Sequence, residues 1–175
     1  MPEYLDLYRR DGTRTGQKIE RGQRVPPGRC VMLVSILTLN SSGEILLTKR
    51  AKEKKYACRW EITGGCVQSG ETAAQGAVRE LSEETGIVVT EQELESRGRY
   101  CRSDYIHAFF LVRKDVPLTE IRLLAGETDD AKWVQPEEYL RLAEEHKTIP
   151  HHTAMIVAHY PELFRESRSK RGTKL

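Results

Sequence analysis

Apolar residues in the first half of the chain follow the patterns of β-strands. Residues 4–8 alternate apolar and polar side chains and lead into Asp11-Gly12, a tight-turn dipeptide, so we expect a hairpin. Residues 30–39 are almost continuously apolar, which predicts a central strand buried on both faces. Residues 44–49 predict a second strand, and the basic stretch 51–59 predicts a loop. Gly64-Gly65 ends the next apolar run, and we expect a tight backbone turn there.

The pattern changes to helical spacing between residues 73 and 85. Thr72 is a suitable N-cap and Gly86 suits a left-handed C-terminal cap. The side chains that form one narrow apolar stripe are Ala74, Ala77, Val78 and Leu81. Because two of them are alanine, this helix is expected to lie close to a sheet.

The second half of the chain returns to strand patterns and ends in helices. Residues 94–101 and 105–112 have strand composition, and a short strand at 133–134 follows an acidic loop at 126–130. Pro136 opens a helix, and residues 152–165 predict a last helix with a break near Pro161. Strands on both sides of the helix at 73–85 predict an α/β protein with a mixed sheet between helices.

Composition limits the class of protein. A chain of 175 residues is long enough for one domain with a full core, expected over residues 1–165. From Arg165 onward there are five basic residues and one acidic residue, so the +2 net charge of the chain leaves −2 on the body. This argues against a nucleic-acid surface, and we expect 166–175 to be a basic, frayed tail.

The sequence also predicts the cellular location of the protein. No segment approaches the roughly 20 apolar residues of a membrane span, and residues 1–12 lack the apolar stretch of a signal peptide. The four cysteines form no CxxC pair and no zinc-type spacing with the histidines. We therefore expect a reducing, cytoplasmic location and no membrane partner.

Three carboxylates share one face of the helix at 73–85. Glu80, Glu83 and Glu84 stand at i, i+3 and i+4, which puts their Cβ atoms about 5–6 Å apart. Carboxylates that close repel one another, and without a cation at least one pKa should rise. The spacing alone leaves two interpretations: a solvated acidic face relieved by Arg79, or a site for a divalent metal.

Residues 65–87 combine these features into one motif. They read Gly, five residues, Glu, seven residues, Arg-Glu-Leu, one residue, Glu-Glu, one residue, Gly-Ile. The stretch resembles the Nudix box of the Nudix hydrolases at every fixed position. The resemblance covers about residues 30–145. It implies an α/β/α sandwich with a mixed β-sheet and a loop–helix–loop catalytic motif at 64–87. Residues 1–29 resemble the N-terminal hairpin extension of a bacterial subgroup related to isopentenyl-diphosphate isomerase.

This resemblance implies a Mg²⁺-dependent hydrolase, with Mn²⁺ as a substitute. Its substrate is a small molecule in which a nucleoside diphosphate is linked to another moiety, X, and water attacks phosphorus with assistance from the metal. The site residues that it implies within the box are direct metal ligands at Glu83 and Glu84, a ligand carbonyl at Gly64 or Gly65, a ligand or general base at Glu80, an orienting guanidinium at Arg79, and a peripheral metal contact through water at Glu71.

Further site residues are expected outside the box. Many family members take one more carboxylate from a later loop. Glu127 is the candidate here, with Asp129 and Asp130 as alternatives to be weighed against a simple exposed acidic loop. Lys49 and Arg50 end a strand that is directed toward the box, so both are candidates to steer the diphosphate.

Arg50 has an alternative role, and Tyr56 is a further candidate for contact with the substrate. Arg50 has a second interpretation, in which it pairs with a box glutamate. Tyr56, in the basic loop, is the candidate to stack on a base.

Three other functions remain as alternatives. The isomerase of isopentenyl diphosphate would need a cysteine where Gly64 stands and a histidine where Cys66 stands. A regulator that binds nucleotide without cleaving it would have lost box glutamates, and none is missing. An RNA-cap hydrolase would need a basic groove on the body. The resemblance also implies a homodimer, which the sequence itself does not show.

Overall fold

A computed structural model describes residues 2–150 and 152–165 of the chain. The basic tail at 166–175 and His151 lie outside the described residues. In chain order, the elements are β1 (Tyr4–Tyr8), β2 (Arg14–Glu20), β3 (Val31–Leu39), β4 (Ile45–Arg50), β5 (Trp60–Glu61), β6 (Thr63–Cys66), α1 (Ala73–Thr85), the 3₁₀ turn Glu91–Glu93, β7 (Glu95–Cys101), β8 (Tyr105–Arg113), the 3₁₀ turn Leu118–Glu120, β9 (Thr128–Val134), α2 (Pro136–Glu144) and α3 (His152–His159).

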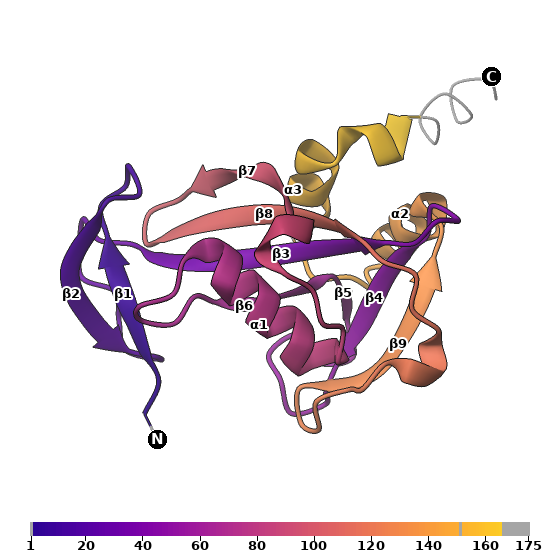
Figure 1. Ribbon diagram of the computed structural model, residues 1–175, viewed down its shortest axis with the longest axis horizontal. Helices are drawn as coiled ribbons and strands as arrows, with labels where there is room; N and C mark the ends of the chain where they lie inside the picture. The colour runs from indigo at the N-terminus through magenta and orange to yellow at the C-terminus, as the bar shows by residue number, and fades with distance from the viewer. Residues whose placement is uncertain (1, 151, 166–175) are drawn as a thin grey trace.

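A seven-stranded mixed sheet forms the centre of the molecule (Figure 1). Its main path runs β5-β4-β3-β8-β7, while β6 pairs with β3 and β9 pairs with β4. β3 and β8 are parallel along their whole length, from Val31 opposite Tyr105 to Leu39 opposite Arg113. The other pairings are antiparallel. The predicted mixed sheet and the predicted central strand at β3 are therefore confirmed.

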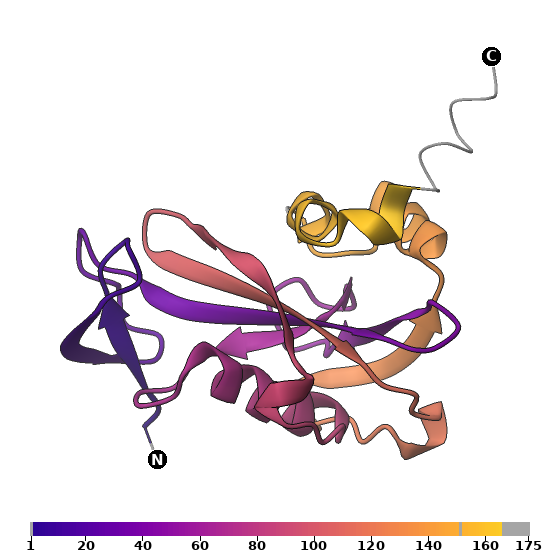
Figure 2. The same cartoon turned by 45° about the horizontal axis from the view of Figure 1, so that its top comes forward.

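Helices cover both faces of this sheet, as Figure 2 shows, with α1 on one side and α3 and α2 on the other. Successive side chains of β3 point to opposite faces. Val34 packs in the cluster that contains Leu81 of α1, while Leu37 packs in the cluster that contains Ile156 of α3. The α/β/α sandwich follows from this alternation, since each face of β3 buries apolar residues against a different helix.

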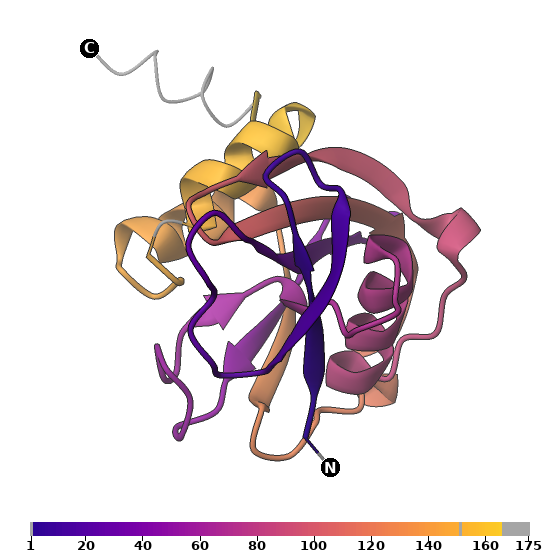
Figure 3. The same ribbon diagram turned by 90° about the vertical axis from the view of Figure 1, so that its left-hand side faces the viewer.

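β1 and β2 form a separate two-stranded sheet at one end of the molecule (Figure 3). Asp6 of this hairpin accepts hydrogen bonds from Ser69 Oγ at 2.7 Å and from the backbone N–H of Gly70 at 3.0 Å. The backbone N–H of Ser69 donates to the Tyr4 carbonyl at 2.7 Å. The hairpin is thus fastened to the loop that leads into α1.

Two later elements refine the sequence predictions. β9 begins at Thr128, so the predicted acidic loop at 126–130 is partly strand. Pairing with β4 extends the strand to Asp129 and Asp130, because ladder hydrogen bonds outweigh their poor strand propensity. The last helix ends at His159 and a helical turn resumes at Pro161, which confirms the predicted break. No helix in the described ranges is long and apolar enough to cross a membrane.

Candidate active site

Local sequence signals fix both ends of α1. Gln75 donates its backbone N–H to Thr72 Oγ1 at 3.1 Å, and Gln75 Oε1 accepts from the backbone N–H of Thr72 at 2.9 Å. At the other end, Gly86 adopts a left-handed φ of 74° and its N–H donates to the Ser82 carbonyl. The predicted caps are confirmed, and they set the rotation at which α1 presents its glutamates.

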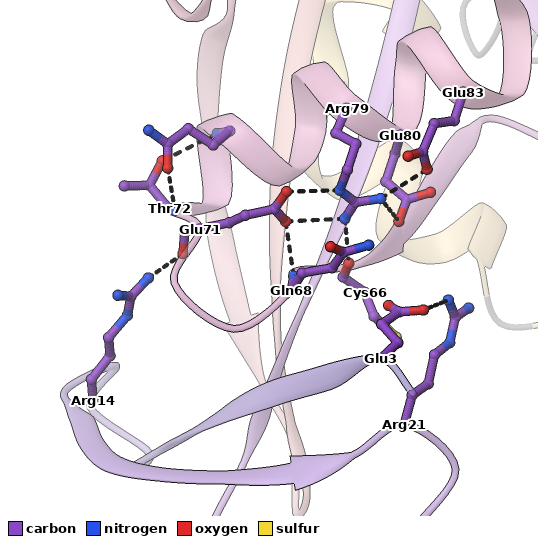
Figure 4. Close-up of polar contacts among 11 residues, drawn as sticks. Glu3, Arg14, Arg21, Cys66, Gln68, Glu71, Thr72, Arg79, Glu80 and Glu83 are labelled. Carbon is purple, nitrogen blue, oxygen red and sulfur yellow. Dashed lines mark hydrogen bonds and ion pairs between the residues drawn. The ribbon is translucent and has the colours of Figure 1, made fainter. Parts of the chain in front are cut away.

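Arg79 is the centre of the charged network on α1 (Figure 4). Its guanidinium donates to Glu71 at 2.7 and 3.1 Å, to Glu80 at 2.9 Å and to Glu83 at 3.0 Å. A further hydrogen bond of 2.8 Å reaches the Cys66 carbonyl. Burial disfavours the charged guanidinium, but the bonds to Glu71 and Glu80 outweigh it and raise the pKa of Arg79. The charge is therefore permanent, and it orients three carboxylates at once.

Both carboxylate oxygens of Glu71 accept hydrogen bonds from Arg79. One of its oxygens accepts from Arg79 Nε, and the other accepts from Arg79 Nη2 and, at 2.8 Å, from the backbone N–H of Gln68. Burial would raise the pKa of Glu71, but Arg79 and the Gln68 N–H lower it below its usual value. With both oxygens engaged, Glu71 orients Arg79, and its peripheral metal contact through water stays a prediction.

Glu84 is a buried carboxylate that a bound cation would stabilise. Its Oε2 atom is buried and has no hydrogen-bond partner. Burial, and then the nearby charges of Glu61 and Glu80, raise the pKa of Glu84 to about 8. Glu80 is buried too, and burial likewise raises its pKa against the opposing effect of Arg79.

Glu61 joins this group from β5, outside the box, and the sequence prediction missed it. Burial raises the pKa of Glu61, although Arg50 donates a hydrogen bond to it at 2.7 Å. Arg50 thus pairs with a carboxylate outside the box, which corrects its suggested pairing with a box glutamate. The only sequence signal for Glu61 is an acidic residue between Trp60 and Ile62 in a short apolar run.

Glu127 approaches the same group from the turn before β9. Its charge contributes to the raised pKa values of Glu84 and Glu61. Its carboxylate pairs with Lys54, and its carbonyl accepts from the backbone N–H of Ala51 at 3.0 Å. The alternatives Asp129 and Asp130 are exposed on β9. Of the three acidic candidates, Glu127 therefore has the surroundings that the sequence prediction required.

The donor set at this point fits a divalent cation. Carboxylate oxygens are the ligands that Mg²⁺ and Mn²⁺ prefer, and an unpartnered buried oxygen on Glu84 is the feature that a cation would satisfy. As the side chains lie, no three acidic, histidine or cysteine groups converge into a ready-made cluster within the described ranges. Arg79 explains this, because it holds Glu80 and Glu83 in ion pairs of 2.9 and 3.0 Å.

Gly64 and Gly65 lie in the extended strand β6, opposite Ser35 and Val34 of β3. The predicted tight turn is therefore wrong, and the glycines serve close packing. A Cβ at Gly65 would overlap the Glu80 carboxylate, while a Cβ at Gly64 would overlap the Val34 carbonyl and come within 3.0 Å of Ser35 Oγ. At Gly64 and Gly65, only the main chain of β6 lies between the Glu80 carboxylate on the α1 side and Ser35 on the opposite side of the sheet.

A pocket of about 560 Å³ lies on that other side, between the sheet and the segment 149–155. Gly64, Gly65, Arg50 and Tyr56 all line it, so two of the three predicted substrate contacts are at the pocket. Tyr56 is 41% exposed, which leaves its ring available to a ligand.

Lys49 is elsewhere, which corrects its predicted place near the box. It lies over the Trp60 ring, with Nζ 5.9 Å from the ring centroid, and lines a separate cavity that also includes Lys132. Neighbouring residues of a strand point to opposite faces, so Lys49 and Arg50 do not share a site.

Comparison with known proteins agrees with this geometry. The family model of the NUDIX domain matches residues 31–153, which include β3, the box and β9. The chain belongs to the Nudix family. A Nudix hydrolase of Listeria monocytogenes is 29% identical to this Nudix chain over 151 residues, 85% of the chain and 89% of the relative.

Two further comparisons bear on activity and fold. The CTP pyrophosphohydrolase of Escherichia coli is 36% identical over 104 residues, 59% of this chain and 75% of that enzyme. The crystal structure of DR0079 from Deinococcus radiodurans superposes with a TM-score of 0.73 at 22% identity, covering 89% of this chain and 97% of that one. The Nudix fold predicted from the sequence is thus confirmed.

Family membership also supplies the class of reaction. As a Nudix hydrolase, the chain acts on a nucleoside diphosphate linked to another moiety. The comparisons give no support to the isomerase or to the regulator that binds without cleaving.

Proposed function

We propose that this Nudix hydrolase uses Mg²⁺, with Mn²⁺ as a substitute, to cleave the diphosphate of a small nucleotide that lies in the pocket beside Gly64 and Gly65. The observation that carries the proposal is the buried, unpartnered Oε2 atom of Glu84, next to the carboxylates of Glu61 and Glu80. A carboxylate in that position is stabilised by a cation and destabilised without one.

Glu84 and Glu83 are the proposed metal ligands, together with a carbonyl of Gly64 or Gly65. Bound there, the metal would polarise phosphoryl oxygens, lower the pKa of the attacking water and neutralise the leaving group. Glu80 either adds a ligand or takes the proton of the water. Its burial supports the second role, since a raised pKa brings a carboxylate closer to the working pH of a general base.

The surrounding charges hold this machinery in place. Arg79 orients Glu80 and Glu83 through its two ion pairs, and Glu71 in turn orients Arg79. Glu127 is the proposed additional carboxylate, and its partner Lys54 keeps it at the rim of the site.

A nucleotide substrate is supported by the pocket and by one relative. The pocket has a basic and aromatic rim at Arg50, Lys55 and Tyr56, which suits a phosphate and a base. The Escherichia coli relative is a CTP pyrophosphohydrolase, so hydrolysis of a nucleoside triphosphate is within the reach of this group. We keep the identity of X open.

Several wider features belong to the same proposal. We propose one Nudix domain over residues 1–165, with residues 1–29 as its hairpin extension. The four free cysteines support a reducing, cytoplasmic location. No nucleic-acid partner is proposed, and a homodimer is proposed from the resemblance alone.

The direct test is a screen of diphosphate compounds with Mg²⁺, in which a coupled phosphatase detects phosphorylated products. The panel contains nucleoside triphosphates, nucleoside-diphosphate sugars, dinucleotides, coenzyme A and isopentenyl diphosphate. We expect turnover of at least one nucleotide that a chelator abolishes and that Mg²⁺ or Mn²⁺ restores. Conversion of isopentenyl diphosphate without any hydrolysis product would contradict the proposal.

The same screen includes variants of the proposed ligands. Glu83→Gln and Glu84→Gln should each lower turnover roughly 100-fold or more while the circular dichroism spectrum stays that of the wild type. Glu91→Gln is the matched control, because Glu91 is an exposed carboxylate beyond the end of α1. Near-wild-type turnover in both ligand variants would remove the metal assignment.

A further inference from the structure

The pocket beside the box has a polar pair in its floor. Ser35 Oγ of β3 lies 2.8 Å from His107 Nε2 of β8, and both residues line the pocket. Both are also buried, at 7% and 6% exposure. Their polar atoms are therefore shielded from bulk water but adjacent to the cavity.

His107 is held as a neutral, fixed ring. Burial, and then the charges of His152 and His159, lower its pKa to about 4. Its ring stacks on Phe109 with centroids 4.5 Å apart, and Phe109 stacks on His159 with centroids 3.9 Å apart. A neutral imidazole has one donor and one acceptor nitrogen, and a serine hydroxyl can donate and accept. The ring also hydrogen-bonds the Val34 backbone, so the pair is rigid and uncharged, and the Ser35 hydroxyl keeps hydrogen-bonding capacity for a ligand.

The sheet places this pair beside the box strand. Ser35 is directly opposite Gly64 of β6, and His107 is directly opposite Tyr100 of β7. β3 lies between β6 and β8. Neighbouring strands are about 4.8 Å apart, so His107 lies about 10 Å across the sheet from the glycines of the box. Because one pocket is lined by Gly64, Gly65, His107 and Tyr100, a nucleotide whose diphosphate lies at the glycines has room for its nucleoside in this direction.

The walls on this side suit a flat ring. Tyr100 of β7 lines the pocket beyond His107, and Tyr105 of β8 and Met155 of α3 line it as well. Aromatic and thioether side chains provide apolar contact for the faces of a heteroaromatic ring. The polar pair in the floor then meets the hydrogen-bonding edge of that ring.

We propose that Ser35 and His107 read the edge of the substrate's nucleobase and determine which base this enzyme accepts. This inference rests on the proposed function only for the position of the diphosphate. A buried group that hydrogen-bonds one base is left unpaired by another, which disfavours the wrong base far more than an apolar wall would.

The test compares two losses of a buried hydroxyl on the same strand. Ser35→Ala removes one member of the pair. Thr38→Val is the matched control, since the Thr38 hydroxyl is buried, has no hydrogen-bond partner and is not part of the pocket lining. The measurement is kcat and KM for ATP, GTP, CTP and UTP, with the thermal midpoint of each variant as a check on folding.

We expect Ser35→Ala to change the ratio of kcat/KM between the best and the worst base by about tenfold or more, mainly through KM. Thr38→Val should leave that ratio within about twofold of the wild type. A purely structural role would lower all four rates by a common factor, and that outcome would overturn the inference. If Ser35→Ala does not fold, His107→Phe replaces it, because phenylalanine keeps a flat ring on Phe109 while removing both nitrogens.

A binding measurement separates this inference from the proposed function. Calorimetry with AMP, GMP, CMP and UMP needs no turnover. Wild-type protein that prefers one monophosphate, and loses the preference in Ser35→Ala, supports the reading of the base even if the hydrolysis screen fails. Turnover in the screen, together with equal affinity for all four monophosphates in wild type and variant, would overturn the reading while leaving the hydrolase intact.

Discussion

The two sides of strand β6 have opposite chemistry. On the α1 side, Arg79 holds three glutamates and a fourth, Glu84, has a buried oxygen without a partner. On the pocket side, Ser35 lies opposite Gly64 and forms a neutral pair with His107, while the Arg50–Glu61 ion pair lines the same pocket. Two residues without side chains, Gly64 and Gly65, separate these environments.

The difference shows how a hydrolase of this kind can divide its tasks. Cations and phosphates are bound by electrostatic attraction, which acts over several ångströms and depends little on the moiety attached to the phosphate. A base is distinguished by directional hydrogen bonds between neutral groups, which depend on shape and register. In the proposed function, the thin backbone between the two sides lets one bound nucleotide reach both of them.

The largest effect should come from removing the charge that organises the α1 side. Arg79→Ala leaves the buried Glu80 without a partner, and we expect a loss of stability of about 3 kcal/mol together with nearly complete loss of turnover. Urea unfolding and steady-state kinetics measure the two effects. Arg113→Ala is the control, since Arg113 pairs with the exposed Glu95 and should change stability by less than about 1 kcal/mol. Equal stability of the two variants would refute the central role of Arg79.

The two glycines allow each side to be disturbed separately. A methyl group at Gly65 displaces the flexible end of Glu80, so Gly65→Ala should lower kcat by about 10- to 100-fold with a small change in stability. At Gly64 the methyl group meets the Val34 carbonyl, which is backbone, so Gly64→Ala should destabilise the fold by about 1–3 kcal/mol. Kinetics and thermal unfolding of the pair check this contrast, and the reverse pattern would contradict it.

The pH dependence of stability distinguishes the charged side from the neutral one. The pKa of Glu84 rises from its ordinary value of 4.5 to about 8 on folding, so the folded state binds the extra proton. This stabilisation is complete below pH 4.5 and is lost as the pH rises toward 8.

In the presence of a metal chelator, the free energy of unfolding of the wild type, measured by urea unfolding, should therefore fall between pH 5 and about 8.5 by an amount on the order of a few kcal/mol. Glu84→Gln should flatten the curve. His107→Phe should leave the decline above about pH 7 unchanged, because the folded and unfolded pKa values of His107, about 4 and 6.5, both lie below that range. The same slope in wild type and Glu84→Gln would show that Glu84 is not the group responsible.

The smallest effect is expected at Lys49. Because its ammonium group lies over Trp60 in a separate cavity, Lys49→Ala should leave kcat/KM within about twofold of the wild type. Lys55→Ala is the contrasting variant, since Lys55 lines the pocket and should raise KM severalfold at low salt. A larger effect from Lys49 than from Lys55 would indicate that the phosphates bind in the cavity lined by Lys49, and it would contradict the proposed position in the pocket.

Much of the fold and of the box could be predicted because the signals are local. The caps at Thr72 and Gly86, the apolar stripe of α1 and the buried strand β3 depend on spacings within a few residues, and the structure has all of them. The i, i+3 and i+4 spacing likewise placed the box glutamates on one face.

Other features could not be predicted because they depend on pairing between distant segments. Glu61 is near Glu84 only because β5 pairs with β4 while β6, which follows it directly in the chain, pairs with β3 beside α1. Lys49 and Arg50 were expected to act together, but the pleat of β4 points them to opposite sides. The sequence analysis also did not identify Glu71, eight residues away, as a hydrogen-bond partner of Arg79.

The sequence by itself determined the family, the helix with its caps and the charged residues of the box, since all of these are set by residue types at short spacing. Only the tertiary structure shows that Gly64 and Gly65 lie in an extended strand, where the lack of a side chain allows close packing, and do not form a turn. It also decided that Ser35 and His107, 72 residues apart, meet in the floor of the pocket. The physical reason is that parallel pairing of β3 and β8 brings distant segments together in register, and no local pattern specifies that register.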